Sequence, residues 1–232
     1  MNARTLRNIV MVLAVAACGG GSSGVTTPPP PPGPPPPPPA AAPVISLVSG
    51  DGQVAVAGSV ASVPLKVLVT QSGSPLGQQA VVWQASSGSL SPAQVNTSGD
   101  GTASSMWTLG ATPGPQTVNA FVGNTSGASV SFSGIGAVVA NGTQVQVDMY
   151  TAGGSRNDPM AVIVHPGTTV TWVWKDGTHS VLSNGTPSFP SGTSADTPHS
   201  YAFTFNTPGT YRYYCFEHGA PGTGMWGMVI VQ

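Results

Sequence analysis

The sequence predicts an all-β protein, because its composition and its pattern agree. Charged residues make up 6% of the 232 residues, while Gly (31) and Pro (24) are abundant. Short runs rich in Val, Thr and aromatic residues alternate with Gly, Pro, Asn and Asp, which is typical of strands joined by turns. We therefore expect a disordered Pro-rich N-terminal tether and two β-sandwiches. The expected division is 1–17, 18–43, 44–137 and 138–232.

The segment 1–17 has the pattern of a secretory signal peptide. Two arginines precede an apolar run, residues 9–17, which is too short to span a membrane. Residues 15–18 read Val-Ala-Ala-Cys and resemble a bacterial lipobox, in which the cysteine is lipidated. The alternative is ordinary cleavage nearby, with Cys18 as a spare thiol. The resemblance implies a membrane anchor through Cys18. Gly19 in place of Asp implies the outer membrane, facing the periplasm or the cell surface.

Residues 18–43 are predicted to form a linker. The part 19–27 is rich in Gly and Ser and is expected to be flexible, whereas 28–39 is nearly all proline. Such a run favours an extended polyproline II rod. Proline-rich segments also serve as ligands of recognition domains. A spacer is the preferred interpretation here, because the run follows a lipid anchor.

The region 44–137 is predicted to be a β-sandwich, from short strands with regular turn signals. The predicted strands are 64–70, 79–84, 102–109, 116–122 and 128–132. Residues 88–92 (Gly-Ser-Leu-Ser-Pro), 100–103 (Asp-Gly-Thr-Ala) and 107–110 (Trp-Thr-Leu-Gly) follow in an order that resembles the invasin-type bacterial Ig-like repeat.

This first region offers no chemistry of its own. It contains no His and no Cys, and its charged residues are Asp51, Lys66 and Asp100. A metal shell or an acid/base pair cannot be assembled from these. We interpret it as a spacer or interaction module.

The region 138–232 is predicted to be a second, Greek-key sandwich of seven short strands. They are 144–149, 161–164, 168–174, 180–182, 200–205, 210–215 and 228–231. The stretch 183–198, rich in Gly, Ser, Thr and Pro, is expected to be a surface loop. Trp172 and Trp174 share one face of their strand and are expected to pack in the core.

Three metal-ligand side chains fall within one loop of this region. Cys215, His218 and Met225 supply a thiolate, an imidazole and a thioether, and His179 lies upstream after a predicted strand. A trigonal site of one Cys and two His with a long axial Met is the blue-copper geometry. The joint spacing of these residues is the signal, because a single Cys or His is usually structural.

This region resembles the cupredoxins, small type 1 copper proteins such as plastocyanin, amicyanin and pseudoazurin. The run 167–172 precedes the first His, and Cys-x-x-His is followed by Met225-Trp226-Gly227. The resemblance implies His179, Cys215, His218 and Met225 as ligands of one type 1 copper ion. Met228 is the alternative axial ligand. It further implies an apolar docking patch for redox proteins around His218, with Gly219, Ala220, Pro221 and Met225. Family members often have Asn or Ser bonding to the Cys segment at the position of Ser180; a plain strand serine is the alternative.

The remaining counts exclude several other functions. The chain has four His, and His165 and His199 are expected at exposed turns, so a trinuclear copper cluster cannot form. This argues against a multicopper oxidase, or a nitrite reductase acting alone. A net charge of −1 without a basic patch argues against nucleic-acid binding. A Cys18–Cys215 disulfide is not expected, because each cysteine has a separate use.

The function that the sequence favours is one-electron transfer in the cell envelope by a membrane-anchored blue copper protein. It would be a carrier and not an enzyme, with no small-molecule substrate. Copper binding for delivery, buffering or sensing is the alternative, because the same ligands serve it. A third hypothesis is an adhesive surface protein whose second domain has lost its metal. The presence of all four ligands argues against it.

Overall fold

The computed structural model describes residues 33–190 and 192–232. The predicted signal peptide (1–17), the lipidation residue Cys18 and the linker residues 19–32 lie outside the described residues. The residues Ala40–Gln232 form one compact unit. Residues 33–42 are exposed and have no regular secondary structure. Within the described residues, no helix is long and apolar enough to cross a membrane.

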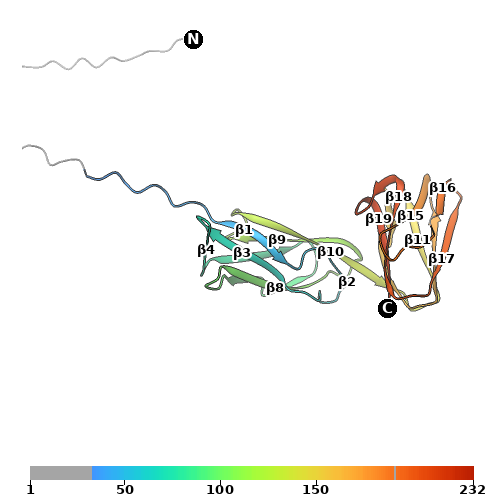
Figure 1. Cartoon of the computed structure of the whole chain (residues 1–232), viewed down its shortest axis with the longest axis horizontal. Coiled ribbons are helices and arrows are strands. Elements are labelled where there is room, and N and C mark those ends of the chain that lie inside the picture. Colours follow the sequence, from blue (N-terminus) through green and yellow to red (C-terminus); the bar gives the residue numbers. More distant parts are fainter. Residues whose placement is uncertain (1–32, 191) are drawn as a thin grey trace, which may run out of the picture. The chain divides into compact units, whose positions relative to one another are not determined.

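The described residues from Val44 onward form strands and turns without helices, which confirms the all-β prediction. The first sandwich comprises β1 (Val44–Ser49), β2 (Gln53–Val56), β3 (Leu65–Gln71), β4 (Ser74–Pro75), β5 (Ala80–Ala85), β6 (Ser89–Ser91), β7 (Gln94–Asn96), β8 (Thr102–Thr108), β9 (Gly114–Val122) and β10 (Ser129–Val139) (Figure 1).

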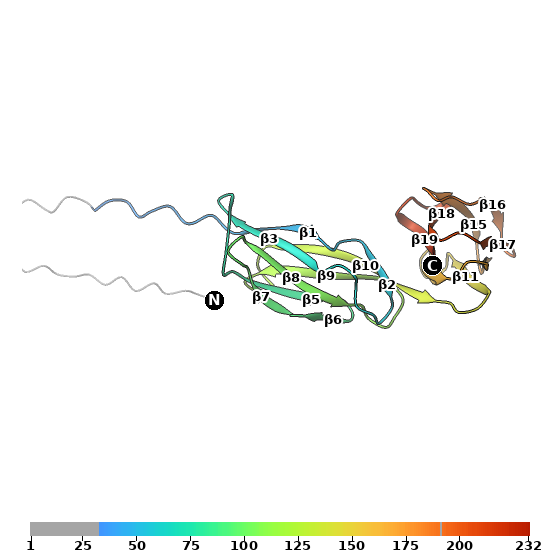
Figure 2. The same cartoon turned by 60° about the horizontal axis from the view of Figure 1, so that its bottom comes forward.

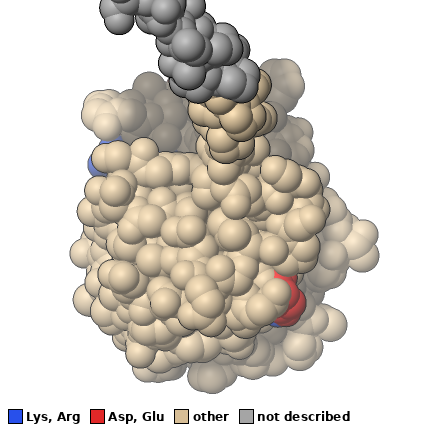
Figure 3. Space-filling model, turned by 90° about the vertical axis from the view of Figure 1, so that its left-hand side faces the viewer, with Lys and Arg blue, Asp and Glu red and all other residues tan. Residues whose placement is uncertain are grey.

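Two sheets enclose the core of the first sandwich. One has the order β1-β3-β8-β6 with β4 beside β3, and the other contains β10-β9-β5-β7 with β2 beside β10. Alternate residues of β3 and β8 are buried, as expected for strands with one face against a core. Leu65, Trp107 and Phe132 are among its fully buried side chains. The surface seen in Figure 3 carries few charged side chains.

The second sandwich follows in the chain and contains the predicted metal ligands. Its strands are β11 (Gln144–Tyr150), β12 (Arg156–Asp158), β13 (Ala161–Val164), β14 (Thr168–Trp174), β15 (Thr178–Asn184), β16 (Gly192–Asp196), β17 (Ser200–Phe205), β18 (Gly209–Ala220) and β19 (Thr223–Val231) (Figure 2). One sheet has the order β12-β11-β14-β17, and the facing path is β16-β15-β18-β19-β13.

Trp172 lies at the centre of the core of the second sandwich. Residues 168, 170, 172 and 174 of β14 are buried on one face, which confirms that Trp172 and Trp174 share a side and pack in the core. The Trp172 ring stacks on Phe189 with centroids 5.7 Å apart and meets Tyr213 edge-on at 5.1 Å. Aromatic pairs in such offset or edge-on arrangements stabilise a core beyond their buried area. This core fixes the strands that carry the candidate ligands.

The strand β10 runs through the predicted boundary between residues 137 and 138. It pairs with β9 up to Gly136, and then Val138 and Val139 pair in parallel with β13. A small apolar cluster forms beside this junction from Ala137, Ala161, Ile163 and Met228.

The prediction that 183–198 is a surface loop is wrong in part. The seven strands predicted for the second sandwich are also too few. The loop contains β16, which pairs with β15, and Phe189, which is buried against Trp172. The loop was predicted from its content of Gly, Ser, Thr and Pro, but it also contains one large aromatic side chain, which is buried in the core. The short strand β12 was also not predicted.

Candidate metal centre

Cys215 and His218 lie where β18 leaves its partner strand. The pairing of β18 with β19 runs to Tyr214 opposite Trp226 and resumes at Gly219 opposite Gly224. Residues 215–218 therefore form a bulge at one end of the sandwich. The closure after it is tight, because a Cβ on Gly219 would lie 2.5 Å from the Met225 nitrogen. A Cβ on Gly224 would lie 2.6 Å from the His218 carbonyl oxygen, so both positions require glycine.

His179 approaches the same point from β15. Its ring is fully buried, and the Trp174 indole Nε1 donates a hydrogen bond of 2.8 Å to its carbonyl oxygen. The register of β15 against β16 shifts between His179 and Val181. Trp174 thus packs in the core, as predicted, and also fixes the backbone of the candidate ligand.

The three donor atoms converge. Cys215 Sγ lies 3.7 Å from His179 Nδ1 and 3.5 Å from His218 Nδ1, and all three ligand atoms lie within 4.8 Å of one another. In zinc sites the metal lies about 2.0 Å from a nitrogen ligand and about 2.3 Å from a sulfur ligand. With these bond lengths and a nitrogen–metal–sulfur angle of about 110–120°, the nitrogen and the sulfur lie roughly 3.5–3.7 Å apart. Both sulfur–nitrogen distances therefore fit bonds to a single first-row ion. A soft thiolate with two imidazoles suits copper.

The protonation of the donors is governed by burial. Burial lowers the pKa of His179, and the nearby His218 acts in the same direction. A neutral imidazole is the form that binds a metal. Burial also raises the pKa of the Cys215 thiol, with a further contribution from the Glu217 side chain. Because the thiolate is the ligand, binding of a metal ion releases this proton.

Glu217, which was not predicted as a site residue, lies between the two ligands of the bulge. Its Oε2 accepts a hydrogen bond of 2.7 Å from Ser180 Oγ and lies 3.2 Å from Cys215 Sγ. Partial burial acts to raise the pKa of Glu217, but hydrogen bonds from Ser194, Ser180 and Cys215 outweigh it and lower the pKa to about 2. The available signal was one carboxylate inside a metal-type loop, in a chain with 6% charged residues.

Ser180 bonds to the cysteine-bearing segment, as one of the two interpretations of this residue predicted. The Phe216 backbone nitrogen donates to Ser180 Oγ at 2.9 Å, and the hydroxyl in turn donates to Glu217. Ser180 Oγ is 4.0 Å from Cys215 Sγ, so its contact with the sulfur is weak.

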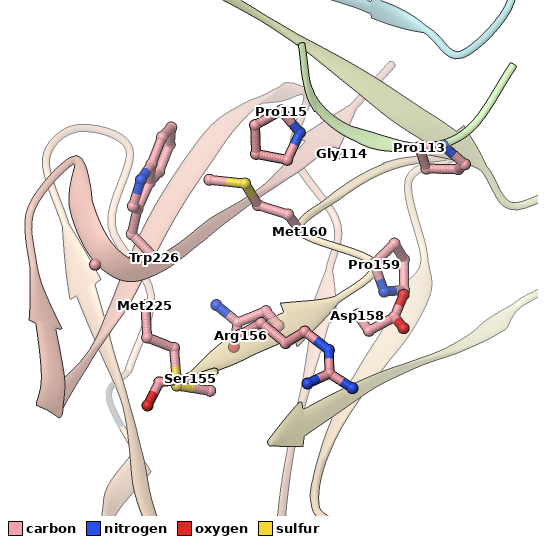
Figure 4. A pocket seen from close by; sticks show the side chains of 12 residues that line it. Pro113, Gly114, Pro115, Ser155, Arg156, Asp158, Pro159, Met160, Met225 and Trp226 are labelled. Carbon is pink, nitrogen blue, oxygen red and sulfur yellow. The ribbon is translucent and has the colours of Figure 1, made fainter. Parts of the chain in front are cut away.

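Met225 and Met228 belong to different clusters. Met225 is 1% exposed and packs in the same core cluster as Cys215, Trp172 and Tyr213. Met228 packs with Ala137, Ala161 and Ile163 at the junction with β10. Met225 also lines a pocket with Trp226 and Met160 (Figure 4). Of the two thioethers, Met225 is the one in the apolar surroundings of the thiol.

The other two histidines lie apart from this group. His165 and His199 are exposed, as expected, and the described cluster of metal-type ligands comprises only His179, Cys215 and His218. His165 Nδ1 lies 3.1 Å from the Gln232 carbonyl oxygen, and His199 packs edge-on against Trp174. Cys215 has a free thiol in the described part of the chain.

Comparison with known proteins finds a halocyanin and a plastocyanin among the relatives of this chain. No family model matches the chain. The chain is 35% identical over 96 residues to halocyanin of Natronomonas pharaonis, covering 38% of this chain and 58% of halocyanin. It is 34% identical over 85 residues to plastocyanin of Scenedesmus fuscus, covering 32% of this chain and 85% of that plastocyanin.

Among solved structures, a purple cupredoxin from Nitrosopumilus maritimus matches with 24% identity and a TM-score of 0.33. The match covers 38% of this chain and 99% of that protein. The chain therefore spans nearly the whole of that cupredoxin and most of the plastocyanin, but less than two thirds of the halocyanin.

Proposed function

Because the chain belongs to the plastocyanin-like cupredoxins, we propose that it carries single electrons between redox proteins through one type 1 copper ion held by His179, Cys215, His218 and Met225. The observation that carries this proposal is the convergence of two imidazole Nδ1 atoms on one thiol sulfur, 3.7 and 3.5 Å away. A copper ion held there supplies a centre that takes up and releases one electron. No bond of a substrate is made or broken, so the protein is a carrier and not an enzyme.

The surrounding residues keep the ligands in place while the charge changes. The Trp174 indole holds the His179 carbonyl, and Gly219 and Gly224 allow the backbone beside His218 and Met225 to close tightly. A ligand set fixed by a rigid β framework moves little between the two oxidation states. Little reorganisation favours rapid electron transfer, in the way that preorganised dipoles favour other charge-changing steps.

We place the docking surface for redox partners around His218, which is partly exposed beside exposed Ala220 and Pro221. Phe216 adds an exposed aromatic ring, with 69% of its surface accessible. The expected contribution of Met225 to this surface is wrong, because that side chain is 1% exposed and packs inward. Aromatic residues are enriched in protein interfaces, so Phe216 suits a docking role.

A carrier and a copper-delivery protein differ in how tightly copper stays bound. We expect fast electron self-exchange between the reduced and oxidised protein, together with slow release of copper to a chelator. Both are measurable on the copper-loaded whole chain, by NMR line broadening and by stopped-flow absorbance. Slow self-exchange with rapid copper release would favour delivery, buffering or sensing instead.

We further propose that the chain is an outer-membrane lipoprotein anchored through Cys18, with the linker 18–43 and a bacterial Ig-like sandwich as spacers. The support is the lipobox-like sequence at 15–18 and the exposed, irregular backbone of residues 33–42. Cys18→Ala is expected to release the protein from membranes or to block its maturation. The measurement is detergent-phase partitioning, and partitioning identical to that of the wild type would argue against the anchor.

A further inference from the structure

The side chain of Glu217 is directed onto the sulfur of the candidate copper ligand. Glu217 Oε2 lies 3.2 Å from Cys215 Sγ, although the residue is exposed to solvent. Exposed glutamates usually adopt many conformations, because immobilising them costs side-chain entropy. A carboxylate held against a buried sulfur therefore needs specific partners.

Two serines supply these partners from neighbouring strands. Ser180 Oγ, in β15, donates to Oε2 at 2.7 Å, and Ser194 Oγ, in β16, donates to Oε1. The Ser180 hydroxyl is itself oriented by the Phe216 backbone N–H, which donates to it at 2.9 Å. Both carboxylate oxygens are thus occupied, and the carboxylate is fixed to β15, β16 and β18 at once.

A fixed carboxylate beside the thiolate changes the charge balance of the site. Two neutral imidazoles, one thiolate and one carboxylate bring the total charge to zero with Cu(II) and to −1 with Cu(I). A negative charge attracts a dipositive ion more strongly than a monopositive one at the same distance. Solvent near the exposed side chain weakens this difference but does not change its sign.

We propose that Glu217 is a positioning residue that sets the charge at the copper site: its serine-held carboxylate stabilises Cu(II) relative to Cu(I) and lowers the reduction potential. This inference rests on the proposed function, because it presupposes copper at Cys215. It assigns a role to the Glu in Cys-x-Glu-His, and it gives Ser180 and Ser194 the same role, which is to hold that carboxylate in place.

The test compares Glu217→Gln with the wild type in the whole chain. Glutamine keeps the size of the side chain and an oxygen for one serine, but removes the charge. We expect a higher reduction potential and Cu(II) binding weakened by about 10- to 100-fold, with a smaller effect on Cu(I) binding. The measurements are voltammetry and competition titrations with copper(II) and copper(I) salts.

Two further variants separate local charge from other effects. Asp100→Asn removes the same charge from a turn of the first sandwich, and its potential should equal that of the wild type. Ser194→Ala keeps the carboxylate but frees one oxygen, and it should raise the potential by less than Glu217→Gln does. Thermal unfolding of the copper-free variants shows whether each folds.

The outcomes distinguish this inference from the proposed function. If Glu217→Gln folds, keeps an intense thiolate-to-copper band and has an unchanged potential, the inference is overturned. An equal shift in Asp100→Asn would also overturn it, because the effect would then be one of net charge. If the wild type itself shows no thiolate-to-copper band, the proposed function fails, and not merely the role of Glu217.

Discussion

Cys215→Ser is expected to abolish the coloured copper site while the second sandwich stays folded. The serine hydroxyl is a far poorer ligand for copper than a thiolate, and the intense absorption of a blue copper site comes from the copper–sulfur bond. The sulfur is also the atom that both imidazole Nδ1 atoms approach, at 3.7 and 3.5 Å. Removing it therefore removes the centre of the ligand set.

The fold should survive this substitution because the core lies mostly elsewhere. Trp172, Phe205 and Tyr213 are fully buried and pack together independently of the sulfur. Burying a poorly paired hydroxyl costs about 1–3 kcal/mol. Absorbance after copper addition and circular dichroism of the same sample measure the two effects. Unaltered colour in the folded variant would remove Cys215 from the site.

Met225→Gln is expected to change both the reduction potential and the optical spectrum. The axial ligand tunes the potential of such sites, and Met225 shares its core cluster with Cys215. An amide oxygen in place of the thioether is a harder ligand and should lower the potential by favouring Cu(II). Voltammetry and absorbance of the copper-loaded variant test this.

Met228→Leu is the matched control for the axial ligand. Met228 packs with Ala137, Ala161 and Ile163, away from the cluster that holds Cys215. A near volume-conserving exchange there should cost less than about 1.5 kcal/mol and leave the potential unchanged. If Met228→Leu shifted the potential and Met225→Gln did not, the axial assignment would be reversed.

Short runs of β-forming residues bounded by turn residues made most of the second sandwich predictable. The predicted bounds of β13 (161–164), β14 (168–174) and β17 (200–205) agree with the structure residue by residue. In β14 alternate residues from Thr168 to Trp174 are buried, so Trp172 and Trp174 share the face that packs against the core. The all-β class followed from the same patterns, whereas the cluster of His179, Cys215 and His218 was predicted from the joint spacing of these residues and the resemblance to the cupredoxins.

Contacts between residues far apart in sequence were not predictable in the same way. Phe189 sits among small polar residues, and only the fold shows that it stacks on Trp172. Glu217 accepts hydrogen bonds from Ser180 and Ser194, which lie in two other strands, and no periodicity of the sequence predicts such a contact. The continuation of β10 into a pairing with β13 depends on tertiary packing, whereas the sequence predicts a boundary at that point.

An optical and EPR spectrum of the whole chain loaded with Cu(II) shows whether a type 1 copper site forms. We expect an intense thiolate-to-copper absorption band and an EPR signal with the narrow copper hyperfine splitting of a type 1 site, at one copper per chain. Both should be lost in Cys215→Ser. A wild-type protein that binds copper without this band, or binds none, would show that His179, Cys215, His218 and Met225 do not form a type 1 copper site.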